Sequence, residues 1–271
     1  MITMVPVISL IPTNMKMNHT FWIALSLAFL SIQTYSVAQS DRFEPGVYKS
    51  ADGDSLQYRL MIPDYNPIRD YPLVVFLHGS GERGEDNKAQ LKWGIQQLAS
   101  DNMMKNFPCF VLAPQCPANG WWSNYENLAD GQLSLKPEAG QAMSLMIELV
   151  ESLIIDLNID TNRVYITGLS MGGYGTFDAI IRRPDLFAAA IPVCGGGDIS
   201  QAKLIKDIPM WIITGSEDSV VDPKLSTDML LELHKEGARP GFTLYPETGH
   251  YSWLAAYSDP MIWAWLFRQS R

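Results

Sequence analysis

The feature that most constrains the fold is a glycine-flanked serine between an apolar run and a helical pattern. Residues 168–172 read G-L-S-M-G, and they follow the strand-like run Val164–Thr167. A helical stretch begins at Gly173 and stops near Pro184. Strand, sharp turn and helix are the context in which G-x-S-x-G presents a nucleophilic serine. The glycines allow a turn so tight that Ser170 takes a strained backbone conformation with its hydroxyl exposed.

Apolar runs and helical patterns alternate along most of the chain. The pattern predicts strands at 47–49, 57–62, 73–77, 109–113, 163–167, 187–193, 210–214 and 242–245, and helices at 87–100, 138–157, 173–181, 223–235 and 259–271, with a loop at 114–137. Such alternation predicts a mostly parallel sheet with helices on both faces. The first two strands form an antiparallel hairpin. The segment between the strands at 187–193 and 210–214 is too short for a large lid domain.

The N-terminal residues have the pattern of a secretory signal peptide. The apolar run Phe21–Ile32 is short of the roughly 20 residues that span a bilayer, Lys16 precedes it, and Ser36-Val37-Ala38 suits cleavage before Gln39. We therefore expect a signal peptide at 1–38, with Met15 as an alternative start, and one domain at 39–271. The protein is expected to be exported, to the periplasm or beyond.

The composition limits the kinds of partner and cofactor that we expect for this protein. Twenty basic and 29 acidic residues give a net charge of −9, which argues against nucleic acid or an anionic membrane as a stable partner. The three cysteines, Cys109, Cys116 and Cys194, do not suggest a disulfide framework. There is no H-E-x-x-H motif and the histidines are scattered, so neither a metal nor a cofactor is expected.

A nucleophilic serine needs a base, and histidine is the side chain suited to that role at neutral pH. His234 lies within a helix, and His78 directly follows the strand at 73–77, where it is expected to organise the next turn. His250 lies in the loop after the last strand, which gives the chain order serine, acid, histidine that accompanies a G-x-S-x-G turn of this kind. We predict that His250 is the base.

The acid is expected in the loop 215–223, which offers three carboxylates. Asp218 is favoured because it follows the turn glycine and precedes an apolar pair that packs the loop down. Asp222 directly precedes Pro223 and is better suited to cap the following helix, although a catalytic role for it stays open. Glu217 is expected to face solvent.

Two backbone N–H groups should form the oxyanion hole, those of Met171 at the helix start and Ser80 in the glycine-rich turn. Trp121, Trp122 and Gly196 are candidates for substrate contact at the carboxyl edge of the sheet. The tryptophan pair is equally compatible with packing the loop onto the domain.

Several segments together resemble the α/β-hydrolase superfamily. They are residues 77–84 (LHGSGERG), 113–117 (APQCP), 168–173 (GLSMGG), 194–198 (CGGGD) and 249–253 (GHYSW). The set is similar to the bacterial secreted esterases of the predicted-peptidase and phospholipase/carboxylesterase-like group, which are related to feruloyl and acetyl-xylan esterases and to polyhydroxybutyrate depolymerases. In that group the acid motif usually reads D-x-x-V-P, and Asp222 stands in the place of the proline.

This resemblance implies a three-layer sandwich with a mostly parallel, twisted sheet of about eight strands and no lid domain. It also implies an acyl-enzyme mechanism acting on small-molecule or polysaccharide-borne esters. The alternatives are a serine peptidase of the prolyl-oligopeptidase type and a non-catalytic, carbohydrate-binding relative. The sequence makes no prediction of oligomeric state.

Overall fold

A computed structural model describes residues 39–64 and 66–271. Contacts group Ser40–Arg271 into one compact unit. The predicted signal peptide at 1–38 lies outside the described residues. No helix within the described ranges is long and apolar enough to cross a membrane.

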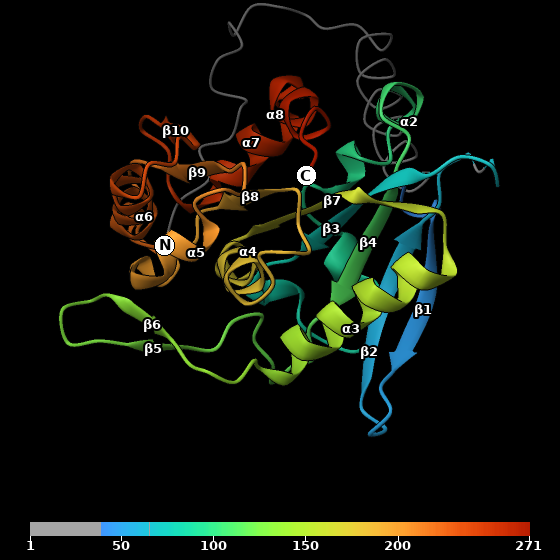
Figure 1. Ribbon diagram of the computed structural model, residues 1–271, viewed down its shortest axis with the longest axis horizontal. Coiled ribbons are helices and arrows are strands. Elements are labelled where there is room, and N and C mark those ends of the chain that lie inside the picture. The colour runs from blue at the N-terminus through green and yellow to red at the C-terminus, as the bar shows by residue number, and fades with distance from the viewer. Residues whose placement is uncertain (1–38, 65) are drawn as a thin grey trace, which may run out of the picture. The chain divides into compact units, whose positions relative to one another are not determined.

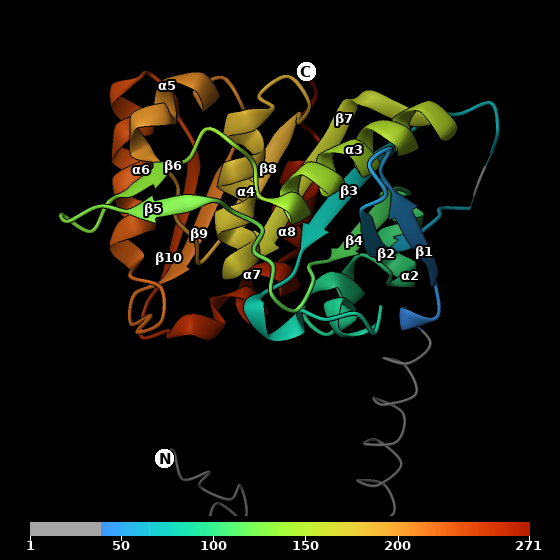
Figure 2. The ribbon, with the colours of Figure 1, turned by 90° about the horizontal axis from the view of Figure 1, so that it is seen from below.

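The unit is built on an eight-stranded sheet whose strands lie in the order β1-β2-β4-β3-β7-β8-β9-β10. Figure 2 shows this order across the molecule, from β10 at one end to β1 at the other. The strands are β1 (Phe43–Lys49), β2 (Ser55–Met61), β3 (Tyr71–Leu77), β4 (Phe110–Gln115), β7 (Ile159–Leu169), β8 (Ala189–Val193), β9 (Trp211–Gly215) and β10 (Gly241–Tyr245). Strands β1 and β2 pair antiparallel, β2 joins β4 antiparallel, and all other pairs are parallel. The predicted mostly parallel sheet of about eight strands is confirmed.

Helices cover both faces of the sheet and close two separate hydrophobic cores. One face is covered by α3 (Gln141–Asp156), α4 (Met171–Arg182), α5 (Ala202–Ile205) and α6 (Pro223–Lys235). The other face is covered by α2 (Asp101–Asn106), α7 (Trp253–Ser258) and α8 (Pro260–Leu266). Figure 1 shows α7 and α8 above the sheet and α3 and α4 below it. The fully buried strand β3 reads as an unbroken apolar run because both of its faces are covered.

The predicted helix at 87–100 is wrong. The segment contains two short 3-10 turns, η3 (Ala89–Leu91) and η4 (Ile95–Gln97), and the true helix α2 follows it. Gly94 interrupts the helical path, with a φ of 73° that L side chains rarely adopt. It packs so closely on Tyr257 that a Cβ at this position would lie 2.3 Å from the ring.

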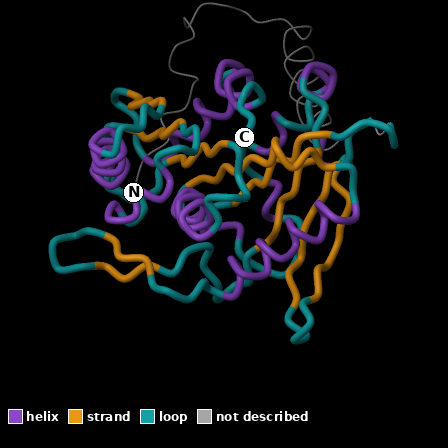
Figure 3. The backbone as a smooth tube through the Cα atoms, in the orientation of Figure 1, coloured by secondary structure: helices purple, strands orange, loops and turns teal. Residues whose placement is uncertain are grey.

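Two further segments differ from prediction. The loop at 114–137 contains a two-stranded hairpin, β5 (Tyr125–Asn127) and β6 (Leu133–Leu135), which projects from the body in Figure 3. The helix expected at 259–271 begins at Pro260, because Asp259 caps its start, and it already ends at Leu266. The preceding α7 is a separate helix.

Candidate active site

Ser170 stands at the sharp turn between β7 and α4. Its φ of 54° and ψ of −116° lie in a region that non-glycine residues seldom occupy. The turn is possible only because its flanking glycines approach the backbone closely: a Cβ at Gly172 would lie 2.0 Å from the Leu77 carbonyl oxygen, and one at Gly168 would lie 2.4 Å from the carbonyl oxygen of Gly172. The motif therefore fixes the serine at the carboxyl edge of the sheet.

Three residues far apart in the sequence meet at this edge. His250 Nε2 lies 2.9 Å from Ser170 Oγ, and His250 Nδ1 lies 2.8 Å from Asp218 Oδ2. A carboxylate can only accept here, so Nδ1 carries the proton and Nε2 is left free to accept the serine hydroxyl. The Asp218 side chain is fully buried and that of His250 is largely buried. The arrangement allows a proton to pass from the hydroxyl to the imidazole.

The two candidate acids have different partners. Asp218 Oδ1 accepts the backbone N–H groups of Val220 and Val221, each at 2.9 Å, which leaves Oδ2 aimed at His250. Asp222 instead accepts the backbone N–H of Lys224 at 2.8 Å and caps α6. Glu217 is exposed. The structure therefore brings Asp218, and not Asp222, to the histidine.

His78 organises the turn that follows β3. Its Nε2 accepts the backbone N–H of Cys116 at 2.9 Å, and its Nδ1 lies 2.6 Å from the carbonyl oxygen of Gly79. Burial lowers the pKa of His78 to about 4, so the ring is neutral at pH 7. A neutral ring with the proton on Nδ1 satisfies both contacts. His234, by contrast, is exposed near the end of α6.

The two predicted oxyanion donors both border the cavity beside Ser170. Met171 is the first residue of α4, and Ser80 is the first residue of the 3-10 turn η2 (Ser80–Glu82). The N–H groups at helix starts have no partner within their own helix. Both are thus available to an oxygen bound next to the serine hydroxyl.

Glu82 is a residue of this site that the sequence analysis missed. It is buried, and desolvation raises the pKa of its carboxyl group. Hydrogen bonds from the Trp93 side chain and the Gly79 backbone oppose that rise. The carboxyl group therefore braces the turn that carries Ser80. A buried carboxyl group inside a glycine-rich loop has no sequence signal beyond its place in the run G-S-G-E.

A cavity of about 540 Å³ opens beside Ser170. Aromatic and apolar side chains from several loops line it, namely Trp121, Tyr125, Leu133, Tyr174, Val220, Val221 and Leu225. Trp121 is 55% exposed at its rim. The β5–β6 hairpin, which the sequence analysis did not predict, supplies one wall.

Two buried carboxylates hold that hairpin in place. Asp178, on α4, accepts the backbone N–H of Asn124 just before β5, and it pairs with Arg182, whose guanidinium also donates to backbone carbonyls of residues 136–138. Asp198 accepts the backbone N–H of Leu135 at the end of β6. The wall of the cavity is therefore fixed to α4, which follows the serine, and to the segment after β8.

The structure does not place Trp122 or Gly196, two of the candidates for substrate contact, in the lining of the cavity beside Ser170. Trp122 is fully buried, and its Nε1 donates to the His78 carbonyl at 3.2 Å. It packs the loop onto the domain, with its side chain so close to Gly175 that a Cβ there would lie 2.4 Å away. Gly196 is buried against Leu133 and Leu225, behind the cavity wall.

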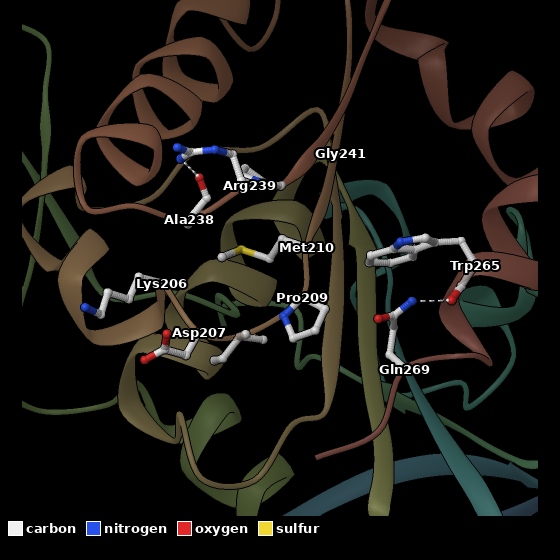
Figure 4. A pocket seen from close by; sticks show the side chains of 11 residues that line it. Lys206, Asp207, Pro209, Met210, Ala238, Arg239, Gly241, Trp265 and Gln269 are labelled. Atoms are coloured by element: carbon white, nitrogen blue, oxygen red, sulfur yellow. Dashed lines mark hydrogen bonds between the residues drawn. The ribbon is translucent and has the colours of Figure 1, made fainter.

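A second cavity, of about 260 Å³, lies at the amino ends of β9 and β10, the edge opposite to Ser170 (Figure 4). Lys206, Asp207 and Arg239 stand on one side of it and Trp265 on the other. The Arg239 guanidinium donates to the Ala238 carbonyl. Nothing in this cavity places it in the chemistry at Ser170.

The three cysteines are all buried as free thiols. Among the described residues, the one cluster of metal-binding side chains joins Cys194 to Asp218 and His250. Both ring nitrogens of His250 already have partners there, so the cluster offers no free imidazole as a ligand.

Comparisons with known proteins agree with this geometry. Residues 139–211 match the prolyl oligopeptidase family. The chain is 28% identical over 192 residues to a poly(3-hydroxyalkanoate) depolymerase C of Paucimonas lemoignei, covering 68% of this chain and 40% of that protein. It is 28% identical over 113 residues to a bifunctional acetylxylan esterase/xylanase of Neocallimastix patriciarum, covering 37% of this chain and 17% of that protein.

The solved structure of a thermostable esterase superposes with a TM-score of 0.80 at 42% identity. The match covers 86% of this chain and 64% of the esterase, so the chain spans less than two thirds of the length of each of these relatives. The sheet order, the serine turn and these likenesses lead to one conclusion. The chain has an α/β-hydrolase fold and is similar to a group of proteins that contains esterases and peptidases.

Proposed function

We propose that this protein is a serine carboxylic-ester hydrolase with Ser170, His250 and Asp218 as its catalytic triad. The observation that carries the proposal is the continuous hydrogen-bond path from Ser170 Oγ through the imidazole to the buried carboxylate. It lies beside a cavity that contains two candidate oxyanion donors. Fold alone does not fix an activity, whereas this set of groups has a defined chemistry.

The proposed reaction has two steps. His250 takes the hydroxyl proton as Ser170 attacks the ester carbonyl, and the N–H groups of Ser80 and Met171 hold the oxyanion. The tetrahedral intermediate collapses as His250 passes the proton to the leaving alcohol. Water then attacks the acyl-enzyme with His250 again as base, which releases the acid and restores the serine. Asp218 keeps the imidazole in the required tautomer and stabilises its positive charge.

The proposed substrates are small-molecule or polysaccharide-borne esters of the acetyl or feruloyl type. Two features support this class: the aromatic lining of the cavity, with Trp121, Tyr125 and Tyr174, and the likeness to an acetylxylan esterase/xylanase. No cofactor enters the proposed reaction, because the triad supplies the nucleophile, the base and the acid.

An ester panel on residues 39–271 tests the proposal. We expect turnover of p-nitrophenyl acetate and methyl ferulate, abolished by Ser170→Ala and strongly reduced by Asp218→Asn. Asp222→Asn is the matched control, since it removes the same charge from the same loop without touching His250. Equal losses in the two aspartate variants would contradict the assignment of the acid.

A peptidase is the second candidate, because residues 139–211 match the prolyl oligopeptidase family. Aminoacyl-anilides in the same panel separate the two activities, and turnover of anilides without esters would defeat the esterase proposal. A non-catalytic carbohydrate-binding protein would turn over neither class and would not react with a fluorophosphonate.

A further inference from the structure

His250 lies between the large cavity and a group of aromatic side chains on its other side. The imidazole contacts Trp253 edge-on, with ring centroids 5.1 Å apart, and Tyr251 at 6.5 Å. Trp93, from the segment before η4, packs on both Tyr251 and Trp253 at 6.3 Å. We call Trp93, Tyr251 and Trp253 the aromatic cluster.

In the proposed reaction, the alcohol portion and the acyl portion of an ester lie on different sides of the reacting carbonyl carbon. His250 must protonate the leaving oxygen, so the alcohol portion of an ester lies within reach of the imidazole when the bond breaks. The acyl portion lies on the other side of the carbonyl carbon, and the large cavity beside Ser170 and Met171 has room for it. The alcohol portion therefore meets the residues that surround His250, including the exposed ring of Tyr251.

A small cavity of about 190 Å³ adjoins the aromatic cluster. Its lining includes Trp93, Gln96, Gln97, Trp253, Leu254 and Ser258, from the segment 92–97 and from α7. Trp253 therefore contacts both the imidazole of His250 and this cavity.

We propose that this small cavity and the aromatic cluster bind the alcohol portion of the substrate, and that this portion is a sugar. The inference rests on the proposed esterase function. A sugar ring presents C–H groups that pack on aromatic faces, and hydroxyls that exchange hydrogen bonds with an amide side chain such as that of Gln97. The cavity has the volume of about six water molecules, which suits one small ring.

The lining disfavours the other common kinds of alcohol. An alkyl alcohol would bury the Gln97 amide without replacing its hydrogen bonds to water, whereas the Gln96 amide and the Ser258 hydroxyl already donate to backbone carbonyls. A cationic alcohol would meet the Lys92 ammonium, which lies 4.9 Å from the centre of the Trp93 ring. A neutral polyhydroxyl ring conflicts with neither feature.

The test compares esters that share one acyl group and differ only in the alcohol: a methyl ester, a hexyl ester and a xylo-oligosaccharide ester. The wild type is expected to favour the oligosaccharide ester in kcat/KM. Gln97→Ala and Leu254→Ala should each reduce that preference about fivefold, mainly through KM, and leave methyl ester turnover unchanged. Ile155→Ala, which removes an exposed side chain from α3, is the control and should leave the preference as it is.

Two results would overturn the inference: equal or better use of the hexyl ester by the wild type, or an oligosaccharide preference that survives both substitutions. A calorimetric titration of the Ser170→Ala protein with unesterified xylo-oligosaccharide is independent of turnover. Binding that weakens on adding Gln97→Ala supports the inference, and absence of binding contradicts it. Failure to hydrolyse any ester in the panel would count against the proposed function and leave this titration as the deciding result.

Discussion

Replacing Trp122 by alanine should unfold the domain more readily without a specific effect on substrate affinity. The indole is fully buried and donates to the His78 carbonyl at 3.2 Å. A buried tryptophan removes about 200 Å² from water, worth at most about 5 kcal/mol at about 25 cal/mol/Å². The lost hydrogen bond adds about 1 kcal/mol, and collapse of the loop recovers part of the total. We expect the free energy of unfolding to fall by about 3–5 kcal/mol, as for other large-to-small core substitutions.

Urea unfolding followed by circular dichroism measures this loss, and initial rates at a temperature where both proteins are folded measure KM. Trp121→Ala is the matched control. Trp121 is the residue next to Trp122, and its side chain is exposed at the cavity rim, where the Arg83 guanidinium lies over the ring. That variant should keep its stability within about 0.5 kcal/mol and raise KM for aromatic esters. An unchanged unfolding free energy in Trp122→Ala, together with a raised KM, would refute the argument that this residue is structural.

Three further predictions concern the turns around the serine. Gly172→Ala should lower the free energy of unfolding by about 3 kcal/mol, because the added Cβ would lie 2.0 Å from the Leu77 carbonyl oxygen. Gly81 has open space around it, so Gly81→Ala should leave the free energy of unfolding nearly unchanged, and urea unfolding measures both variants. His78 has a pKa of about 4 in the folded protein against an ordinary 6.5, so the unfolded chain binds a proton in this interval and the native protein does not. Stability is therefore complete above pH 6.5 and falls by up to about 3 kcal/mol as the pH drops to about 4, a slope that His78→Asn should flatten in unfolding curves between pH 7 and 4.5. Glu82→Gln should lower kcat about tenfold with little change in KM, because it weakens the brace on the oxyanion turn, and an unchanged kcat would contradict that role.

The parts of the fold that follow local patterns could be predicted from the sequence. A strand that is buried on both faces, such as β3, has an unbroken apolar run, and surface elements do not have such a run. The turn at Ser170 has no room for a Cβ at the flanking positions, so glycine is required there. The chain order of serine, aspartate and histidine places their loops at one edge, because parallel strands end on the same side of a sheet. Asp222 before a proline indicated a helix cap, and the structure shows that cap.

The remaining features depend on contacts between distant segments. Residues 87–100 carry buried side chains at helical spacing, yet packing of Gly94 on Tyr257 breaks the helix. The β5–β6 hairpin is held by Asp178 and Asp198, whose role no local pattern reveals. Adjacent tryptophans look alike in the sequence, and only the structure separates the buried Trp122 from the exposed Trp121.

The central claim is that Ser170 is activated by His250, and covalent labelling tests it most directly. Residues 39–271 would be treated with a fluorophosphonate and digested, and the peptides examined by mass spectrometry. We expect one adduct per chain on Ser170, and a labelling rate reduced at least about a hundredfold in His250→Gln, because general base catalysis contributes about that factor or more. Absence of the adduct, an adduct on another serine, or equal labelling of the His250→Gln protein would contradict the account.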